Sequence, residues 1–260
     1  MRALLLGLAL AYVVVLLIAP LAGIAYYALK PGFGSIVDTL QLPDVQHAFY
    51  LTAVIMLVAV VVTCVLGIVV ALVLARDHFP GKAVVSALVN LPLAVSPVIV
   101  GLMAILLFGT AGWFEPFFAE QGIQIMFALP AMVLVTIFIS IPFVIREVAP
   151  LLEELGMDEE QAAWTLGASR LQTFFRITLP NIRWGLLYGT ALSAARAIGE
   201  VGAVLIVSGL LQGRTETATL YIFRALDDRQ YVGAYSAALV LGLISLTLVL
   251  GADMLRGKEH

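Results

Sequence analysis

The chain has 260 residues, of which 62% are hydrophobic and only 12% charged, and its formal net charge is -3. Soluble domains average about 45–50% apolar and about 25% charged residues, so a soluble core of this length could not bury so much apolar surface. Disordered chains are poor in apolar residues, and the small net charge indicates no nucleic acid or other polyanionic partner. The sequence therefore predicts a protein whose solvent is the lipid bilayer.

Six stretches are long and apolar enough to cross a bilayer, which takes about 20 residues as a helix. They cover residues 3–29, 51–75, 83–108, 125–148, 184–207 and 232–255. The first could be a cleaved signal peptide, but its apolar run exceeds the usual core of about 7–15 residues, so we expect a retained helix. Barrel strands need an alternating pattern that these runs lack. We expect an all-α membrane protein with six transmembrane helices in a single domain, residues 1–260.

The distribution of basic residues predicts the orientation, because Lys and Arg accumulate in short cytoplasmic loops. With the amino terminus inside, the inner loops and ends contain Arg2, Arg76, Lys82, Arg146, Arg170, Arg176, Arg183, Arg256 and Lys258. The outer loops contain Lys30, Arg214, Arg224 and Arg229. This excess favours a multi-pass protein of the inner (cytoplasmic) membrane with both termini in the cytoplasm.

The third span contains Asn90, Pro92, Ser96 and Pro97. Proline removes a backbone donor and frees a carbonyl, so this helix should bend or break. Broken helices at membrane depth are tolerated where they line cavities. Two interpretations are equally good. Either Ser96 and Pro97 lie beside a translocation pathway, or the helix has a simple kink that is packed against its neighbours.

The connection between spans four and five, residues 149–183, is longer than a helical hairpin requires and has its own helix signals. Asp158 can cap a helix whose third residue is Gln161, and Gly167 suits the left-handed conformation that ends a helix. Ser169 starts a second helix, and Gln172 completes a capping box. We therefore expect two short helices in the cytosol.

The second of these helices has apolar bulk at Leu171, Phe174 and Phe175, and Pro180 should close it. Exposed aromatic groups on a cytosolic helix favour a docking element for another protein. An amphipathic helix that lies on the membrane surface is an equally good interpretation.

Span five has a face of small and polar residues at intervals of three or four: Gly185, Gly189, Ser193, Arg196, Glu200, Ala203 and Val207. Small residues allow helices to approach closely in a membrane. Arg196 and Glu200 are one turn apart and can pair, and a charged group facing lipid costs about 2.5–3.5 kcal/mol. The pair should therefore face protein or an aqueous anion route. A pathway role and a purely structural role remain open alternatives.

The sequence contains few residues for catalysis or metal binding. Cys64 stands alone, and His47, His78 and His260 are too scattered for a metal site. No nucleophile–base arrangement appears, and no phosphate-binding Gly-x-x-x-x-Gly-Lys-[Ser/Thr] loop is present. We expect no catalytic residue, metal or cofactor in this chain.

The inner loop resembles the EAA loop of ABC importer permeases. Gln161-Ala162-Ala163 is followed by Gly167 and then by Ile177-Thr178-Leu179-Pro180 at the spacing of that motif. Gln161 replaces the leading glutamate of the family, and Glu160 stands directly before it. The resemblance implies that the short helix enters a cleft on an ATPase subunit. It assigns this coupling role to Gln161, Ala162, Ala163, Gly167, Ser169, Leu171, Phe174, Phe175 and Pro180 within the 158–180 loop.

A narrower resemblance links the chain to sulfate/thiosulfate importer permeases, and among them to the W-type subunit. It rests on residues 90–98, 142–147, 178–189 and 195–204, together with Val207-Ser208-Gly209 and residues 213–216. It implies the type I ABC importer permease fold and transport of sulfate or thiosulfate. The implied partners are a homologous permease, an ABC ATPase dimer that holds ATP and Mg, and an extracytoplasmic sulfate-binding protein. Molybdate or tungstate import, and secondary anion transport, are the alternatives.

Overall fold

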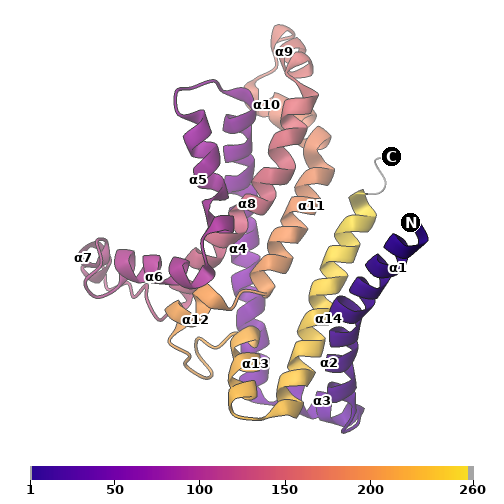
Figure 1. Ribbon diagram of the computed structural model, residues 1–260. Coiled ribbons are helices and arrows are strands. Elements are labelled where there is room, and N and C mark those ends of the chain that lie inside the picture. The colour runs from indigo at the N-terminus through magenta and orange to yellow at the C-terminus, as the bar shows by residue number, and fades with distance from the viewer. Residues whose placement is uncertain (1, 257–260) are drawn as a thin grey trace. The chain divides into compact units, whose positions relative to one another are not determined.

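The computed structural model describes residues 2–256, and every regular element in that range is helical (Figure 1). Lys258 and His260, both named from the sequence, lie outside the described residues. The elements are α1 (Arg2–Val13), η1 (Val14–Ile18), α2 (Ala19–Leu29), α3 (Phe33–Gln41), α4 (Pro43–Arg76), α5 (Lys82–Ala94), α6 (Pro97–Phe108), α7 (Glu115–Ala119), α8 (Leu129–Leu155), α9 (Asp158–Thr165), α10 (Arg170–Thr173), η2 (Phe174–Thr178), α11 (Leu179–Ile198), α12 (Gly202–Ser208), α13 (Ala218–Asp227) and α14 (Tyr231–Arg256). The segments η1 and η2 are single π-helical turns.

Four helical segments are long and apolar enough to cross a membrane: residues 5–29, α4, α8 and the 231–254 part of α14. Two bent pairs meet the same criterion, α5 with α6 at 112° and α11 with α12 at 54°. Within the described residues, the chain therefore has six spans if each bent pair is one span. The all-helical membrane fold is confirmed, and the observed helices differ from the predicted spans in their ends and in the bend between α11 and α12, which the sequence did not predict. For example, α4 begins at Pro43 and α8 continues to Leu155.

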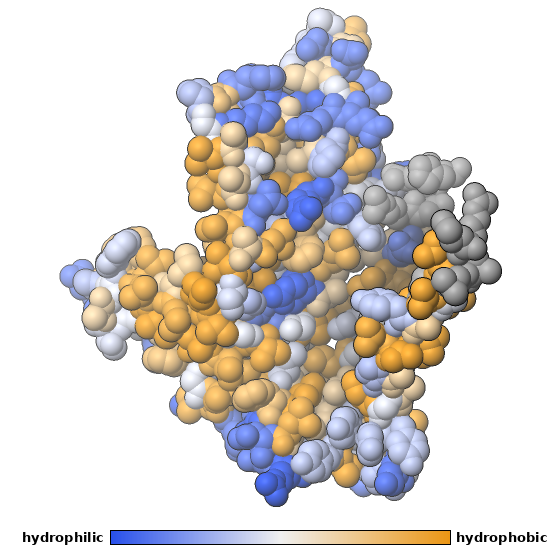
Figure 2. Space-filling view, in the orientation of Figure 1, coloured by the Kyte–Doolittle hydropathy of each residue, from blue (hydrophilic) through white to orange (hydrophobic). Residues whose placement is uncertain are grey.

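The chain divides into two compact units. The terminal unit comprises Met1–Leu51 and Gln212–Ile244, and the central unit comprises Thr52–Leu211 and Ser245–His260. In the central unit, α9 lies at the end of α8 and α11 that also carries the turn between α4 and α5 (Figure 1). Figure 2 shows hydrophilic side chains gathered at this end and apolar side chains over much of the spanning helices.

Glycines allow α4, α8 and α11 to pack closely in the central unit. A Cβ atom on Gly67 would lie 2.6 Å from Cγ1 of Val144, and one on Gly189 would lie 3.1 Å from Cα of Val144. Around this contact, Ala71, Val148 and Ile182 are fully buried. Small residues at helix interfaces are the usual basis of association in lipid, where hydrophobic burial between helices contributes little.

The terminal unit has a separate core, formed by Val45, Ala48, Tyr221, Ala225, Ala234 and Ala237. The Arg224 side chain holds α13 in place through two hydrogen bonds to the Glu216 carboxylate, at 2.6 and 3.1 Å. Hydrogen bonding to Glu216 raises the pKa of Arg224, and burial raises the pKa of Tyr221 above its ordinary value of 10.0. The guanidinium and the phenol therefore keep their usual protonation states at neutral pH.

We expect Gly67→Ala to lower the thermal unfolding midpoint of the detergent-solubilised protein. The added Cβ would lie 2.6 Å from Cγ1 and 2.8 Å from Cβ of Val144, and overpacking of this kind costs about 1–3 kcal/mol. Gly242→Ala is the matched control, because a Cβ at that position has no neighbour within 4 Å. Equal midpoints for the two variants would contradict the close contact between α4 and α8.

Candidate functional sites: the inner loop and the junction of the broken spans

The inner loop between α8 and α11 is a helix–turn–helix with both ends of its turn fixed by hydrogen bonds. Gly167 has a left-handed backbone, with φ of +86°, which glycine adopts without strain. The N–H of Ala168 donates to the carbonyl of Ala163, and the N–H of Gly167 donates to that of Trp164, so the end of α9 is closed by its own backbone. The Ser169 side chain and Gln172 form the predicted capping box. These two sequence predictions are confirmed.

The tip of this loop exposes large apolar side chains. Leu166 is 88% exposed, Leu171 71% and Phe175 60%, whereas Phe174 is half-buried against Phe175 in an edge-to-face contact of 5.0 Å. Single exposed apolar residues are ordinary, but several together on a rigid turn indicate a contact surface. Leu166 was not among the residues singled out from the sequence, because its exposure depends on the direction of the turn.

The residues of the Gln161-Ala162-Ala163 motif lie on α9. Gln161 and Ala162 are exposed, and Ala163 is half-buried. The carboxylate that enters the protein belongs to the preceding residue, Glu160, which is 8% exposed. The departure of this chain from the family pattern therefore leaves a neutral side chain at the exposed position and a buried acid beside it.

The ion pair of Glu160 and Arg76 joins four segments of the central unit. Oε1 of Glu160 accepts a hydrogen bond from Nη2 of Arg76 at 3.0 Å and another from the Thr178 hydroxyl at 2.8 Å. Nη1 of Arg76 donates to the carbonyl of Leu152 at 2.9 Å, which satisfies a group that the end of α8 leaves without a helical partner. Residues from α4, α8, α9 and η2 thus meet at one ion pair. No local sequence pattern predicts it, because Arg76 and Glu160 are far apart in the chain.

Two details of the predicted loop are wrong. Asp158 is the first residue of α9 and not its cap, since Met157 occupies the cap position without a side-chain hydrogen bond. Pro180 does not close a helix, because the helical path continues from Arg170 to Ile198. The π-helical turn before Pro180 widens the helix there, and the N–H of Leu179 bonds to the carbonyl of Phe174, so the missing proline donor is accommodated.

The second candidate site is the junction where the two broken spans meet. The span formed by α5 and α6 breaks at Ser96, whose extended backbone is the conformation favoured before a proline. A Cβ on Gly202, at the start of α12, would lie 2.9 Å from Cβ of Pro97. A Cβ on Gly101 of α6 would lie 2.7 Å from Cβ of Ile206 on α12. The breaks in the two spans therefore lie against one another.

Arg196 and Glu200 form the predicted ion pair at this junction, with Nη1 and Oε2 2.7 Å apart. The pair does not lie on one continuous helix, however, because α11 ends at Ile198 and Glu200 stands in the break. Oε1 of Glu200 accepts a hydrogen bond from the N–H of Ala203 at 2.8 Å, so the same carboxylate caps α12. The Glu200 side chain is 2% exposed and that of Arg196 is 29% exposed.

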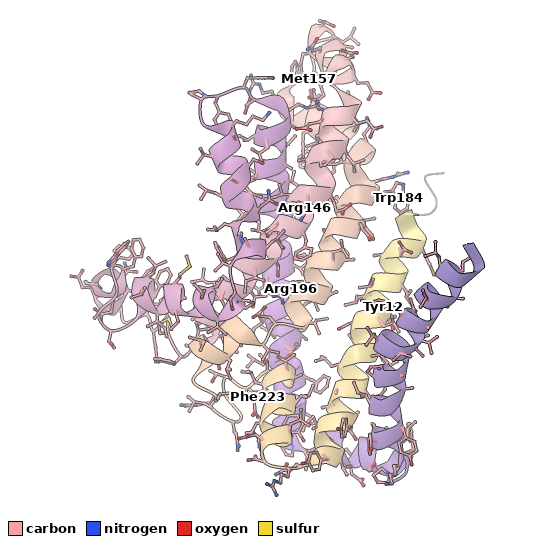
Figure 3. All side chains as sticks on the ribbon, viewed as in Figure 1. Tyr12, Arg146, Met157, Trp184, Arg196 and Phe223 are labelled. Carbon is pink, nitrogen blue, oxygen red and sulfur yellow. The ribbon has the colours of Figure 1, made fainter. Side chains whose placement is uncertain are left out.

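The other predicted pathway residues differ in burial and in their contacts. Ser96 is exposed and Pro97 half-buried at the junction, but Ser193 is fully buried and shares a hydrogen bond of 3.0 Å with Thr63 on α4. Ser193 therefore joins two helices in this structure. Figure 3 labels Arg146 and Arg196 along the same face of the central unit, and at these places Figure 2 shows hydrophilic patches within an apolar surface. Among residues 2–256, no three His, Cys, Asp or Glu side chains are arranged to hold a metal ion.

Several known proteins are similar to this chain in sequence. A family model described as "Binding-protein-dependent transport system inner membrane component" matches residues 64–257. The sulfate transport system permease protein CysW of Synechococcus elongatus is 45% identical over 249 residues, which cover 95% of this chain and 87% of that protein. The sulfate transport system permease protein CysT of Salmonella typhimurium is 35% identical over 253 residues, covering 97% and 91%.

A solved structure with a similar chain is that of a bacterial alginate ABC transporter in complex with an alginate pentasaccharide-bound periplasmic protein. The two chains are 21% identical, with a TM-score of 0.79 and coverage of 97% of this chain and 92% of the other. At this identity the likeness concerns the fold alone.

We expect Glu160→Gln to loosen the inner loop. The substitution replaces the carboxylate that faces Arg76 with a neutral amide, and hydrogen bonds to charged groups contribute about 1.5–3 kcal/mol. Amide hydrogen exchange in residues 156–169 should become at least about tenfold faster. Glu159→Gln removes the same charge from an exposed neighbour whose partner is the neutral Asn181, and should leave exchange nearly unchanged. Unaltered exchange in Glu160→Gln would refute the anchoring role.

Arg196→Ala should destabilise the junction, because it removes the counter-ion of a carboxylate that is only 2% exposed. Part of the loss in thermal unfolding midpoint should return in Arg196→Ala/Glu200→Gln. In that double variant no buried charge remains, and the amide oxygen can still accept the N–H of Ala203. A midpoint for Arg196→Ala equal to that of the unaltered protein would argue that the ion pair is dispensable.

Proposed function

Because the chain belongs to the family of binding-protein-dependent transport system inner membrane components, we propose that it is the transmembrane permease subunit of an ATP-driven sulfate/thiosulfate importer. Its fold is that of an ABC importer permease. It would lie in the inner membrane with both termini in the cytoplasm, as the distribution of basic residues favours. The assignment of sulfate is supported by the names of its CysW and CysT relatives.

The observation that carries the proposal is the geometry of the inner loop. A docking element must be rigid to transmit motion, and here the turn is fixed by Gly167, the capping box and the Glu160–Arg76 ion pair. The exposed Leu166, Leu171 and Phe175 would enter an apolar cleft on the ATPase. The coupling residues are then Gln161, Ala162, Ala163, Gly167, Ser169, Leu171, Phe174, Phe175 and Pro180, with Pro180 acting inside the helix that leads to the membrane.

The energy source has to come from partner subunits. The sequence has no phosphate-binding loop, so ATP and Mg would be held by an ATPase dimer and this chain would be non-catalytic. Two kinds of sulfate permease, CysW and CysT, are similar to this chain, which supports a heterodimer with a homologous permease. An extracytoplasmic sulfate-binding protein would deliver the anion.

The junction of the broken spans is the proposed part of the translocation pathway in this chain. Arg196 is 29% exposed and supplies a positive group, while Glu200 fixes its position and reduces its net charge. Ser96 and Pro97 form the adjoining break, and Ser193 would act indirectly through its bond to Thr63. Partial neutralisation suits a pathway, because an anion has to leave each site as readily as it enters.

The test is uptake of radiolabelled sulfate by cells that lack their own importer and express the complete transporter. We expect unlabelled sulfate and thiosulfate to compete, and molybdate and tungstate to compete poorly. Gly167→Val should insert normally but transport little, because a left-handed backbone costs a non-glycine residue about 1–2 kcal/mol and displaces the loop. Gly242→Val, in open space on α14, is the control. Competition by molybdate alone would overturn the assignment of sulfate, and full uptake by Gly167→Val would overturn the coupling role.

A further inference from the structure

A hollow of about 730 Å³ in the central unit is lined mainly by residues of α5 and α8. Five of its lining residues are polar or charged: Lys82, Ser86, Asn90, Arg146 and Glu153. The first three are spaced by four residues along α5, so they share one face of that helix. A polar face on an otherwise apolar spanning helix requires water, a partner or a ligand opposite it.

The polar groups on the two sides of the hollow do not satisfy one another. Within residues 2–256, the hydrogen bond made by these five side chains is the one from Nδ2 of Asn90 to the carbonyl of Ser86, at 2.8 Å, inside α5 itself. Pro150 also lines the hollow, and its missing N–H removes the usual helical partner of the Arg146 carbonyl. Both walls of the hollow therefore have side-chain donors that the opposite wall does not satisfy.

The charges are arranged unequally along the hollow. Lys82 begins α5, and Glu153 lies in the last turn of α8, so these opposite charges lie at the helix ends that border the hollow. Asn90 and Arg146 lie about 10–12 Å farther along their helices, from a rise of about 1.5 Å per residue. Arg146 is exposed and has no ion pair within the described part of the chain. The part of the hollow beside Asn90 and Arg146 thus has an unbalanced positive charge.

We propose that this hollow binds a tetrahedral oxyanion, with Arg146 as its charged anchor. The planar guanidinium offers paired N–H donors that match two oxygens of such an anion, and the Ser86 hydroxyl and the second N–H of Asn90 add neutral donors. That sulfate is the occupant rests on the proposed function. In such an importer, the hollow would hold sulfate before the permease releases it. The phosphate of an anionic phospholipid has the same chemistry and is the other source.

The experiment measures equilibrium binding of radiolabelled sulfate to the assembled transporter, without its binding protein, in nanodiscs. Discs of phosphatidylcholine are compared with discs that also contain phosphatidylglycerol. We expect Arg146→Gln to weaken sulfate binding at least about tenfold and Arg146→Lys to recover part of it. Lys30→Gln, which removes the same charge from an exposed site in the other unit, should bind as the unaltered protein does. Retention of the ATPase by each variant verifies assembly.

The outcomes separate the two sources and the two proposals. One outcome is that phosphatidylglycerol competes with sulfate and co-purifies with the unaltered protein but not with Arg146→Gln. This outcome would support the oxyanion site and assign it to lipid. Equal sulfate binding and equal lipid retention in Arg146→Gln would overturn the site. Uptake by the unaltered transporter is measured in parallel. If uptake fails while binding depends on Arg146, the hollow is supported and the importer assignment falls.

Discussion

A helix that breaks inside a membrane leaves backbone groups without water, and this constraint shapes the central unit. In both broken spans, residues close to the break satisfy this constraint. The Glu200 carboxylate accepts the N–H of Ala203 at the start of α12, while Pro97 has no N–H to satisfy at the start of α6. Gly202 approaches Pro97 closely, so each of the two breaks covers the other. The polar junction is thus a consequence of making two breaks tolerable at the same place.

The inner loop and the junction are joined by one helical path. The helical path from Arg170 to Ile198 has no cap or break between the loop and Arg196, since Pro180 is absorbed by the π-helical turn η2. At its loop end, the Thr178 hydroxyl is bonded to Glu160 and hence to Arg76. A displacement of the loop would therefore reach the junction along a single helix, while α4 and α8 are held at the same ion pair.

Local features could be predicted from the sequence, and features that depend on distant contacts could not. Gly167, the Ser169 capping box and a break in the proline-containing third span follow from the conformational preferences of a few residues, and all three are observed. The prediction that Pro180 closes a helix is wrong. Proline usually ends a helix, but here a π-helical turn accommodates it. The Glu160–Arg76 ion pair and the hollow at Arg146 depend on how α4, α5, α8 and α9 pack, which no periodicity specifies.

Arg146 and Arg196, the cations of the two proposed anion sites, differ in how they are packed. Arg196 has a buried carboxylate 2.7 Å away, so its field at a passing anion is reduced. Arg146 lacks such a partner within the described residues, and it is exposed on the wall of the hollow. A bare guanidinium in a dry pocket would hold a divalent oxyanion too tightly to release it. We therefore expect pairing to weaken anion binding at the proposed Arg196 site and exposure to weaken it at the proposed Arg146 site, so that neither cation holds an anion too tightly.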